Sequence, residues 1–323
     1  MRRECEISIQ GSTEMQVPER FICDHTFSAD GPLLICVGGL HGNEPAGVEA
    51  SLRISQAIEL GKITGLRGRI ISILGNRSAL RQKVRFISTD LNRLWIPQKV
   101  NKIKDALING GVKTLEPEEK EQLELYQCLE DILAQEKDRE LYFIDLHSTS
   151  SHGSPFIICA DSPESKSFAT MFPIPIVSGL GALVGTLLEH MTSLGATSFV
   201  CEGGQHDSNE TIIALEQLLL SVMLKLRMIN GGEDASAREV LRSLTNGVPR
   251  RLHITYRHAI TEKDQFRMKP GYRNFTAVKQ GEVLATDAQG DVSCPSDGLI
   301  FMPLYQARGE DGFFLVTPFD EAN

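Results

Sequence analysis

Four short segments of the chain place imidazole, carboxylate and guanidinium groups at spacings that suit hydrolytic chemistry. The first is HGNE at 41–44, which directly follows an apolar run. In a helical turn, the side chains of His41 and Glu44 would fall on one face. Such a pair can reach one divalent cation, and zinc accepts both ligand types. By itself the pair is more typical of a surface histidine near a glutamate at a helix start.

Two further segments close apolar runs with titratable side chains. In LYFIDLH at 141–147, the alternation of a strand puts Asp145 and His147 on one face. His147 is expected to complete a three-ligand metal site with an open fourth position, and Asp145 to orient a ligand. A hydrogen-bonded histidine and a salt-bridged carboxylate are the ordinary alternatives. In CEGG at 201–204, Glu202 is expected to act as a general base if a metal is present, and is otherwise a loop carboxylate.

The fourth segment, RFISTDLNR at 85–93, offers groups that bind anions. Arg93 presents a planar fork to a substrate carboxylate, and Asn92 can donate to the same group. Arg85 is a candidate for stabilising an oxyanion, although single arginines are usually solvated surface charges. Three polar residues near these segments are interpreted as loop residues rather than cleft residues: His152, His206 and Asp207.

Alternating strands and helices are predicted to position these segments. Short apolar strands are expected at 33–38, 68–76, 141–147 and 196–204. Longer helices are expected at 45–60, 116–135 and 209–228, the second beginning with the polar turns PEEKEQ. This alternation predicts an α/β fold with a mostly parallel mixed sheet flanked by helices. From Gly247 onward only short strand-like pieces occur, so we expect domains at 1–244 and 245–323, the second small and all-β.

Composition narrows the functional classes. The chain has 323 residues, 41% of them hydrophobic and 23% charged, which is typical of a globular protein with a full core. A net charge of −9 argues against general nucleic-acid binding. No apolar run approaches the roughly 20 residues that span a bilayer, and no apolar signal core follows the N-terminal arginines. The seven cysteines lack CxxC spacing, so we expect reduced thiols and a cytoplasmic protein.

Together, GGLHGNEPAG, RFISTDLNR, FIDLHSTSSHG and VCEGG resemble, in this order, the succinylglutamate desuccinylase/aspartoacylase family, a branch of the zinc carboxypeptidase-like fold. The resemblance covers roughly residues 33–230. It implies one zinc ion per subunit, held by His41, Glu44 and His147. It also implies a set of catalytic and substrate-binding roles: Glu202 as general base, Arg85 polarising the scissile carbonyl, and Asn92 with Arg93 on the substrate's α-carboxylate.

The chain departs from this pattern at one position and matches it loosely at another. Aspartoacylases carry an arginine shortly before the catalytic glutamate, to hold a distal carboxylate of the acyl group. The corresponding stretch here, EHMTSLGAT at 189–197, has no arginine, so a neutral acyl group is expected. The family's substrate-contacting tyrosine has its nearest candidate in Tyr305, which a packing role explains equally well.

The segments therefore predict a zinc-dependent hydrolase that cleaves the amide bond of a small N-acyl amino acid or a similar carboxylate-bearing amide. A carboxypeptidase-like metallopeptidase acting on short peptides and an inactive metal-binding interaction protein are the alternatives. A C-terminal domain that caps the cleft would favour small substrates. We expect a small-molecule carboxylate substrate and no nucleic-acid or membrane partner. The oligomeric state stays open, a homo-oligomer included.

Overall fold

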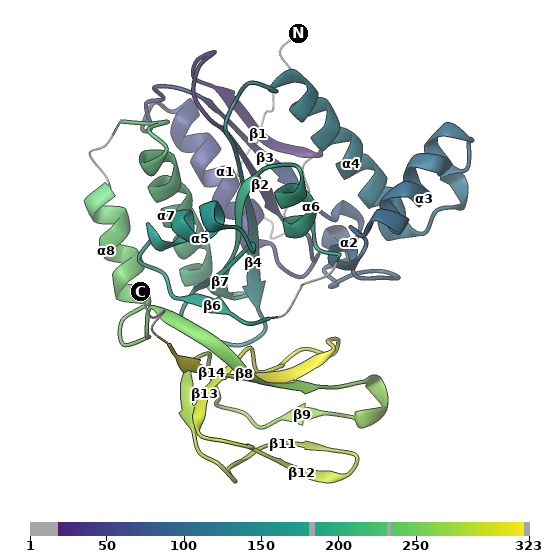
Figure 1. The fold of residues 1–323 in the computed structure, drawn as a ribbon, viewed down its shortest axis with the longest axis vertical. Coiled ribbons are helices and arrows are strands. Elements are labelled where there is room, and N and C mark those ends of the chain that lie inside the picture. Colours follow the sequence, from purple (N-terminus) through teal and green to yellow (C-terminus); the bar gives the residue numbers. More distant parts are fainter. Residues whose placement is uncertain (1–18, 181–184, 231–233, 320–323) are drawn as a thin grey trace, which may run out of the picture.

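The computed structural model describes residues 19–180, 185–230 and 234–319. Helices cover both faces of a central sheet, and the C-terminal strands gather at one end of it (Figure 1). Among the helices described, none combines the length and apolarity that crossing a bilayer requires. The N-terminal residues, on which the expected lack of a signal sequence rests, lie outside the described residues.

The predicted strands and helices are all present. The elements of the α/β part are β1 (Phe21–Thr26), β2 (Leu33–Gly38), α1 (Ala46–Glu59), β3 (Arg69–Leu74), α2 (Arg77–Gln82), η1 (Leu91–Arg93), α3 (Pro97–Ile108), η2 (Val112–Thr114), α4 (Pro117–Gln135), β4 (Leu141–Thr149), β5 (Phe156–Cys159), α5 (Pro163–Thr170), β6 (Ile176–Ser178), α6 (Leu187–Ser193), β7 (Thr197–Gln205), α7 (Asn209–Lys225) and α8 (Asp234–Leu244). The C-terminal elements are β8 (Arg251–Ala259), η3 (Glu262–Asp264), β9 (Arg267–Met268), β10 (Thr276–Val278), β11 (Val283–Asp287), β12 (Gly290–Ser293), β13 (Gly298–Phe301) and β14 (Asp311–Pro318).

One sheet of the described chain holds eleven strands, in the order β1-β3-β2-β4-β7-β5-β6-β8-β14-β13-β10. Strands β3, β2, β4 and β7 pair in parallel. Strand β1 is antiparallel to β3, and β5 is antiparallel to β7 but parallel to β6. The expected α/β fold with a mostly parallel mixed sheet is confirmed. Because β8 pairs with β6, this sheet continues into the antiparallel C-terminal strands. The predicted domain boundary falls between α8 and β8 and stays a prediction.

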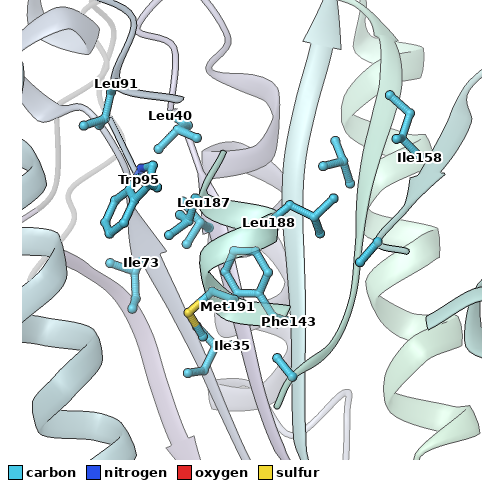
Figure 2. Packing of buried hydrophobic residues seen from close by; sticks show 14 of the residues in the cluster. Ile35, Leu40, Ile73, Leu91, Trp95, Phe143, Ile158, Leu187, Leu188 and Met191 are labelled. Atoms are coloured by element: carbon cyan, nitrogen blue, oxygen red, sulfur yellow. The ribbon is translucent and has the colours of Figure 1, made fainter. Parts of the chain in front are cut away.

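The central strand β2 shows why the sheet has continuous apolar runs. All six of its residues are buried, because helices cover both faces of the sheet. Ile35 belongs to the core on the α4 and α6 side, and Cys36 to the core on the α1 and α7 side. Figure 2 shows the first of these cores, where Ile35 lies near Phe143 of β4 and Met191 of α6. A strand buried on both faces cannot show the alternation of a half-exposed strand.

The turn after β2 is packed tightly against α2. A β-carbon on Gly42 would lie 2.1 Å from the backbone carbonyl carbon of Ala79, far inside van der Waals contact. Position 42, directly after His41, therefore requires a glycine. The HGNE turn therefore packs directly against the backbone of α2.

Candidate metal centre and active site

The predicted chemistry gathers at the carboxyl ends of β2, β4 and β7. His41 and Glu44 lie in the turn between β2 and α1, where the Glu44 N–H donates to the His41 carbonyl at 3.1 Å. His147 near the end of β4 lies directly beside Glu202 of β7 in the parallel register. Neighbouring parallel strands end at the same edge of a sheet, so three segments far apart in the sequence deliver their side chains to one place.

His41, Glu44 and His147 form a buried cluster whose ligand atoms lie within 4.8 Å of one another. Nδ1 of His41 lies 2.8 Å from Oε1 of Glu44, and Nδ1 of His147 lies 3.0 Å from Oε2 of the same carboxylate. Two imidazoles and one carboxylate form a donor set that zinc accepts, with a fourth position left for water or substrate. The residues therefore fit a divalent metal ion.

A carboxylate lies behind each imidazole. Nε2 of His147 is 2.9 Å from Oδ2 of Asp145, and Nε2 of His41 is 3.1 Å from Oδ1 of Asp90. Carboxylates in this position fix the tautomer and orientation of a metal-binding histidine, with Nδ1 left to face the metal. Asp145 thus lies where an orienting group is expected. Asp90, which lies within RFISTDLNR, is a second such group that was not predicted.

The electrostatics of the cluster favour a positive charge at its centre. Burial by itself raises the pKa of Glu44, but the charges of His41 and His147 hold it well below its ordinary value. Burial lowers the pKa of His147, whereas the carboxylates of Asp145 and Glu44 raise it well above the ordinary value. The anionic side chains thus outweigh the cost of burying a positive charge.

Glu202 lies at the edge of this cluster in a different environment. The residue is 8% exposed, and burial raises the pKa of its carboxyl to about 8. Oε2 of Glu202 has no hydrogen-bond partner among the described residues. A general base works best when its pKa lies near the operating pH, and a free carboxylate oxygen can accept a proton from water. These properties suit the role that the sequence analysis expects of Glu202.

The cluster opens into a cavity of about 110 Å³ that the C-terminal region partly covers. The lining residues include His41, Glu44, Arg85, Ser148, Glu202 and His206 from the α/β part, and Met302, Pro303, Leu304, Gln306, Gly309 and Glu310 from the segment between β13 and β14. A larger cavity of about 790 Å³, next to α5 and β6, contains none of the predicted site residues. The segment between β13 and β14 therefore forms a partial cap over this cavity.

His206 connects this cap to the metal site. Its Nδ1 lies 2.8 Å from the hydroxyl of Ser148, and its Nε2 lies 3.3 Å from Oε1 of Gln306. Asn43 donates to the same Gln306 oxygen at 2.9 Å, and the Ser148 N–H donates to Glu44 at 3.0 Å. The interpretation of His206 as a loop residue is wrong, because the residue lines the cavity. The sequence shows only its closeness to CEGG as a signal.

Arg85 lines the same cavity next to the cluster. Its guanidinium donates to Oδ2 of Asp90 at 3.1 Å and to Oε1 of Glu44 at 3.4 Å. The structure thus brings Arg85 together with the predicted metal ligands. A planar cation at this position can donate to a substrate oxygen that develops negative charge.

Asn92 and Arg93 follow Asp90 on η1 and do not line this cavity. The side-chain oxygen of Asn92 accepts the Leu187 N–H at 2.9 Å, so its amide group is the part that can donate to a carboxylate. Arg93 is exposed and donates to the Asn92 carbonyl at 2.9 Å.

Tyr305 has a packing role. Its hydroxyl donates to the Lys269 carbonyl at 2.8 Å and accepts the Tyr272 N–H at 3.0 Å, and the residue does not line the cavity. The tyrosine therefore holds neighbouring C-terminal loops together.

The fold and this site define the class of the protein. Residues 30–227 match the family described as the succinylglutamate desuccinylase/aspartoacylase catalytic domain. The chain belongs to this family of amidohydrolases, which deacylate N-acyl amino acids and act on small carboxylate substrates.

A curated relative and several solved structures are similar to this chain over most of its length. A succinylglutamate desuccinylase of Pseudomonas fluorescens (strain Pf0-1) is 28% identical over 294 residues, which are 86% of this chain and 78% of that protein. The structure of the ectoine utilization protein EutE (DoeB) from Ruegeria pomeroyi matches with a TM-score of 0.62 at 17% identity, over 89% of this chain and 85% of that one. A succinylglutamate desuccinylase/aspartoacylase from Rhodobacter sphaeroides also gives 0.62 at 17% identity, over 90% and 86%.

Proposed function

We propose that the protein is a zinc-dependent hydrolase that cleaves the amide bond of a small N-acyl amino acid. One zinc ion per subunit would be held by His41, Glu44 and His147, the three buried side chains whose ligand atoms converge. When bound, zinc supplies a Lewis acid that acidifies water and polarises a carbonyl group. The observation that carries the proposal is the free carboxylate oxygen of Glu202 beside this cluster.

The remaining chemistry falls to the side chains around the cluster. Glu202 takes a proton from the attacking water and returns it to the departing nitrogen. Arg85 donates to the oxygen of the scissile carbonyl as negative charge develops there. Asn92 and Arg93, which follow Asp90 outside the cavity lining, would hold the α-carboxylate of the amino acid through charge-assisted hydrogen bonds, as the family resemblance implies. These four residues lie on β7 or on the segment 85–93. The HGNE turn contacts that segment, because the Gly42 N–H donates to the Arg85 carbonyl at 3.1 Å.

The cavity supports a small substrate with a neutral acyl group. Its volume of about 110 Å³ and its cover from the C-terminal region favour an N-acyl amino acid over a peptide. Among the described residues that line it, Arg85 is the one lysine or arginine. A succinyl carboxylate therefore lacks a dedicated cation. The division into a catalytic domain at 1–244 and a capping domain at 245–323, and a cytoplasmic location, belong to the same proposal.

Turnover of a substrate panel by zinc-reconstituted protein tests this function. The panel contains N-acetyl and N-succinyl derivatives of the same amino acids, together with short dipeptides. We expect hydrolysis of the N-acetyl series, slower hydrolysis of the N-succinyl series and little release from dipeptides. Protein that binds no divalent metal after reconstitution would overturn the zinc assignment. Preference for dipeptides would favour the metallopeptidase instead, and preference for the succinyl series would reveal a further cation at the acyl end.

A further inference from the structure

The segment 85–95 carries much of the proposed machinery but has little regular structure of its own. Arg85, Asp90, Asn92 and Arg93 all lie on it, and the single turn η1 is its one regular element. Backbone of this kind keeps its shape only where other parts of the molecule satisfy its polar groups. The helix α4 supplies the partners at both ends of the segment.

Glu118, in the first turn of α4, holds the first part of the segment. Its carboxylate is buried, and the residue is 1% exposed. Oε1 accepts the Ile87 N–H at 2.6 Å, and Oε2 accepts the N–H groups of Ser88 and Thr89 at 2.9 and 3.2 Å. The Ser88 hydroxyl donates to Oε2 at 2.7 Å, and Asn76 at the start of α2 donates to Oε1 at 3.3 Å. One carboxylate thus accepts three consecutive backbone N–H groups.

Gln122, one turn further along α4, holds the second part. Its side-chain amide donates to the Leu94 carbonyl at 2.6 Å, and the residue is fully buried. Leu91 and Trp95 also anchor this stretch, because their side chains enter the apolar core near Leu187 (Figure 2). Glu118 and Gln122 in the first turns of α4 therefore point inward. They form hydrogen bonds with the segment before Asp90 and after it.

We propose that Glu118, assisted by Gln122, is a positioning residue for the reaction. It clamps the segment 85–95, which places Arg85, Asn92 and Arg93 correctly relative to the metal ligands when substrate binds. The inference rests on the proposed function. It assigns Glu118 no contact with substrate. The residue acts through the backbone of 87–89 and, at the next position, through Asp90 behind His41.

The negative charge of Glu118 is essential to this clamp. A carboxylate offers acceptors on both oxygens, whereas the amide of glutamine would turn an N–H₂ group toward N–H donors. Burial raises the pKa of Glu118, but the hydrogen bonds from Ser88 and from the backbone of 87–89 lower it overall. The folded segment and the ionised carboxylate therefore stabilise each other.

Hydrogen exchange of the amides at 87–89, read by mass spectrometry, tests the clamp without any substrate. Ser88 and Thr89 are exposed, so we expect any protection of their amides from exchange to come from their bonds to Glu118. We expect Glu118→Gln to accelerate exchange at 87–89 by about tenfold or more. The matched control is Glu119→Gln: Glu119 is on the same helix and buried, but it accepts from Lys102 and Glu116 rather than from the segment. The control should leave exchange at 87–89 at the wild-type rate.

A milder variant keeps the test informative if Glu118→Gln folds poorly. Ser88→Ala removes one donor to the carboxylate from an exposed position, and should accelerate exchange at the same amides by a smaller factor. Equal rates at 87–89 in wild type, Glu118→Gln and Ser88→Ala would overturn the clamp. So would an acceleration that Glu119→Gln reproduces or that spreads evenly over the whole chain, since either would mean general destabilisation.

Kinetics then separate positioning from the proposed function itself. With the substrate preferred by wild type, Glu118→Gln should lower kcat/KM by about tenfold or more, through a higher KM and a lower kcat together, at unchanged zinc content. Glu119→Gln should change neither. A normal kcat/KM for Glu118→Gln despite faster local exchange would overturn the catalytic part of the inference. If wild type hydrolyses nothing, the proposed function fails, and the exchange experiment still decides whether Glu118 holds the segment.

Discussion

Replacing Glu202 with glutamine separates metal binding from proton transfer. The change keeps the shape of the side chain and exchanges one oxygen for an N–H₂ group. Oε2 of Glu202 has no partner among the described residues, so the change breaks no described hydrogen bond of that atom. The metal ligands His41, Glu44 and His147 stay in place. What disappears is the ability to accept a proton from water.

The expected loss is large. A positioned general base contributes about 10²–10⁴-fold to the rate. This range corresponds to about 3–5 kcal/mol of transition-state stabilisation. We therefore expect kcat of Glu202→Gln to fall by two to four orders of magnitude, with KM and zinc content close to the wild-type values.

Two measurements on the same preparation test this. Initial rates on the preferred N-acyl amino acid report the loss of turnover, and mass spectrometry reports the zinc content. Glu210→Gln is the control for charge, since Glu210 is exposed in the first turn of α7. His147→Ala is the control for metal, since it removes a ligand and should lose zinc and turnover together. Near-normal turnover of Glu202→Gln would refute its role as base. Loss of zinc from that variant would mean that Glu202 is itself a ligand.

Three further substitutions test the surroundings of the site. Asp90→Asn should weaken zinc binding about 10–100-fold in a chelator competition, because Nε2 of His41 loses its carboxylate; unchanged affinity would contradict this role. Arg93→Ala should cost about 1.5–3 kcal/mol in kcat/KM on amino-acid amides and little on an amide without the carboxylate, so equal losses would speak against it. Arg20→Met removes the cation 2.6 Å from buried Glu121 and should cost about 3–5 kcal/mol in denaturant unfolding at neutral pH. Burial raises the pKa of Glu121 but Arg20 lowers it overall, so this stabilisation is present above the unfolded pKa and is lost as the pH falls through the folded value. A stability difference that stays constant with pH would refute that cause.

The strands that carry the site were predictable because burial on both faces leaves a clear pattern. LLICVG and LYFIDLH are continuous apolar runs, and they form β2 and the first part of β4. The structure extends β4 to Thr149, beyond the predicted end at 147, because pairing with β7 continues to Gln205. A polar pair such as Ser148 and Thr149 gives no apolar signal, so the extension was not visible in the sequence.

The supporting residues of the site were not predictable, because tertiary contacts give them their roles. Asp90 is 49 positions from His41, and Gln306 is 100 positions from His206. Glu118 belongs to a run of charged residues that a solvated helix start explains equally well. Metal-ligand residues at a short spacing can be recognised within one segment of the sequence. A hydrogen bond between residues far apart in the chain leaves no pattern in either segment.

The charge of the site explains why its carboxylates and a metal ion belong together. Glu44, Asp90, Asp145 and Glu202 bring four largely buried carboxylates to one strand edge, and Arg85 is the guanidinium that pairs with two of them. Buried anions without compensation are costly. Asp90 and Asp145 reduce this cost because each lies next to the outer nitrogen of one imidazole, which leaves the inner nitrogens for a cation. The same arrangement that would destabilise the folded chain by itself therefore suits a divalent metal, with its proposed ligands already oriented. Glu202 forms no described hydrogen bond with either imidazole, which fits its proposed role in moving a proton.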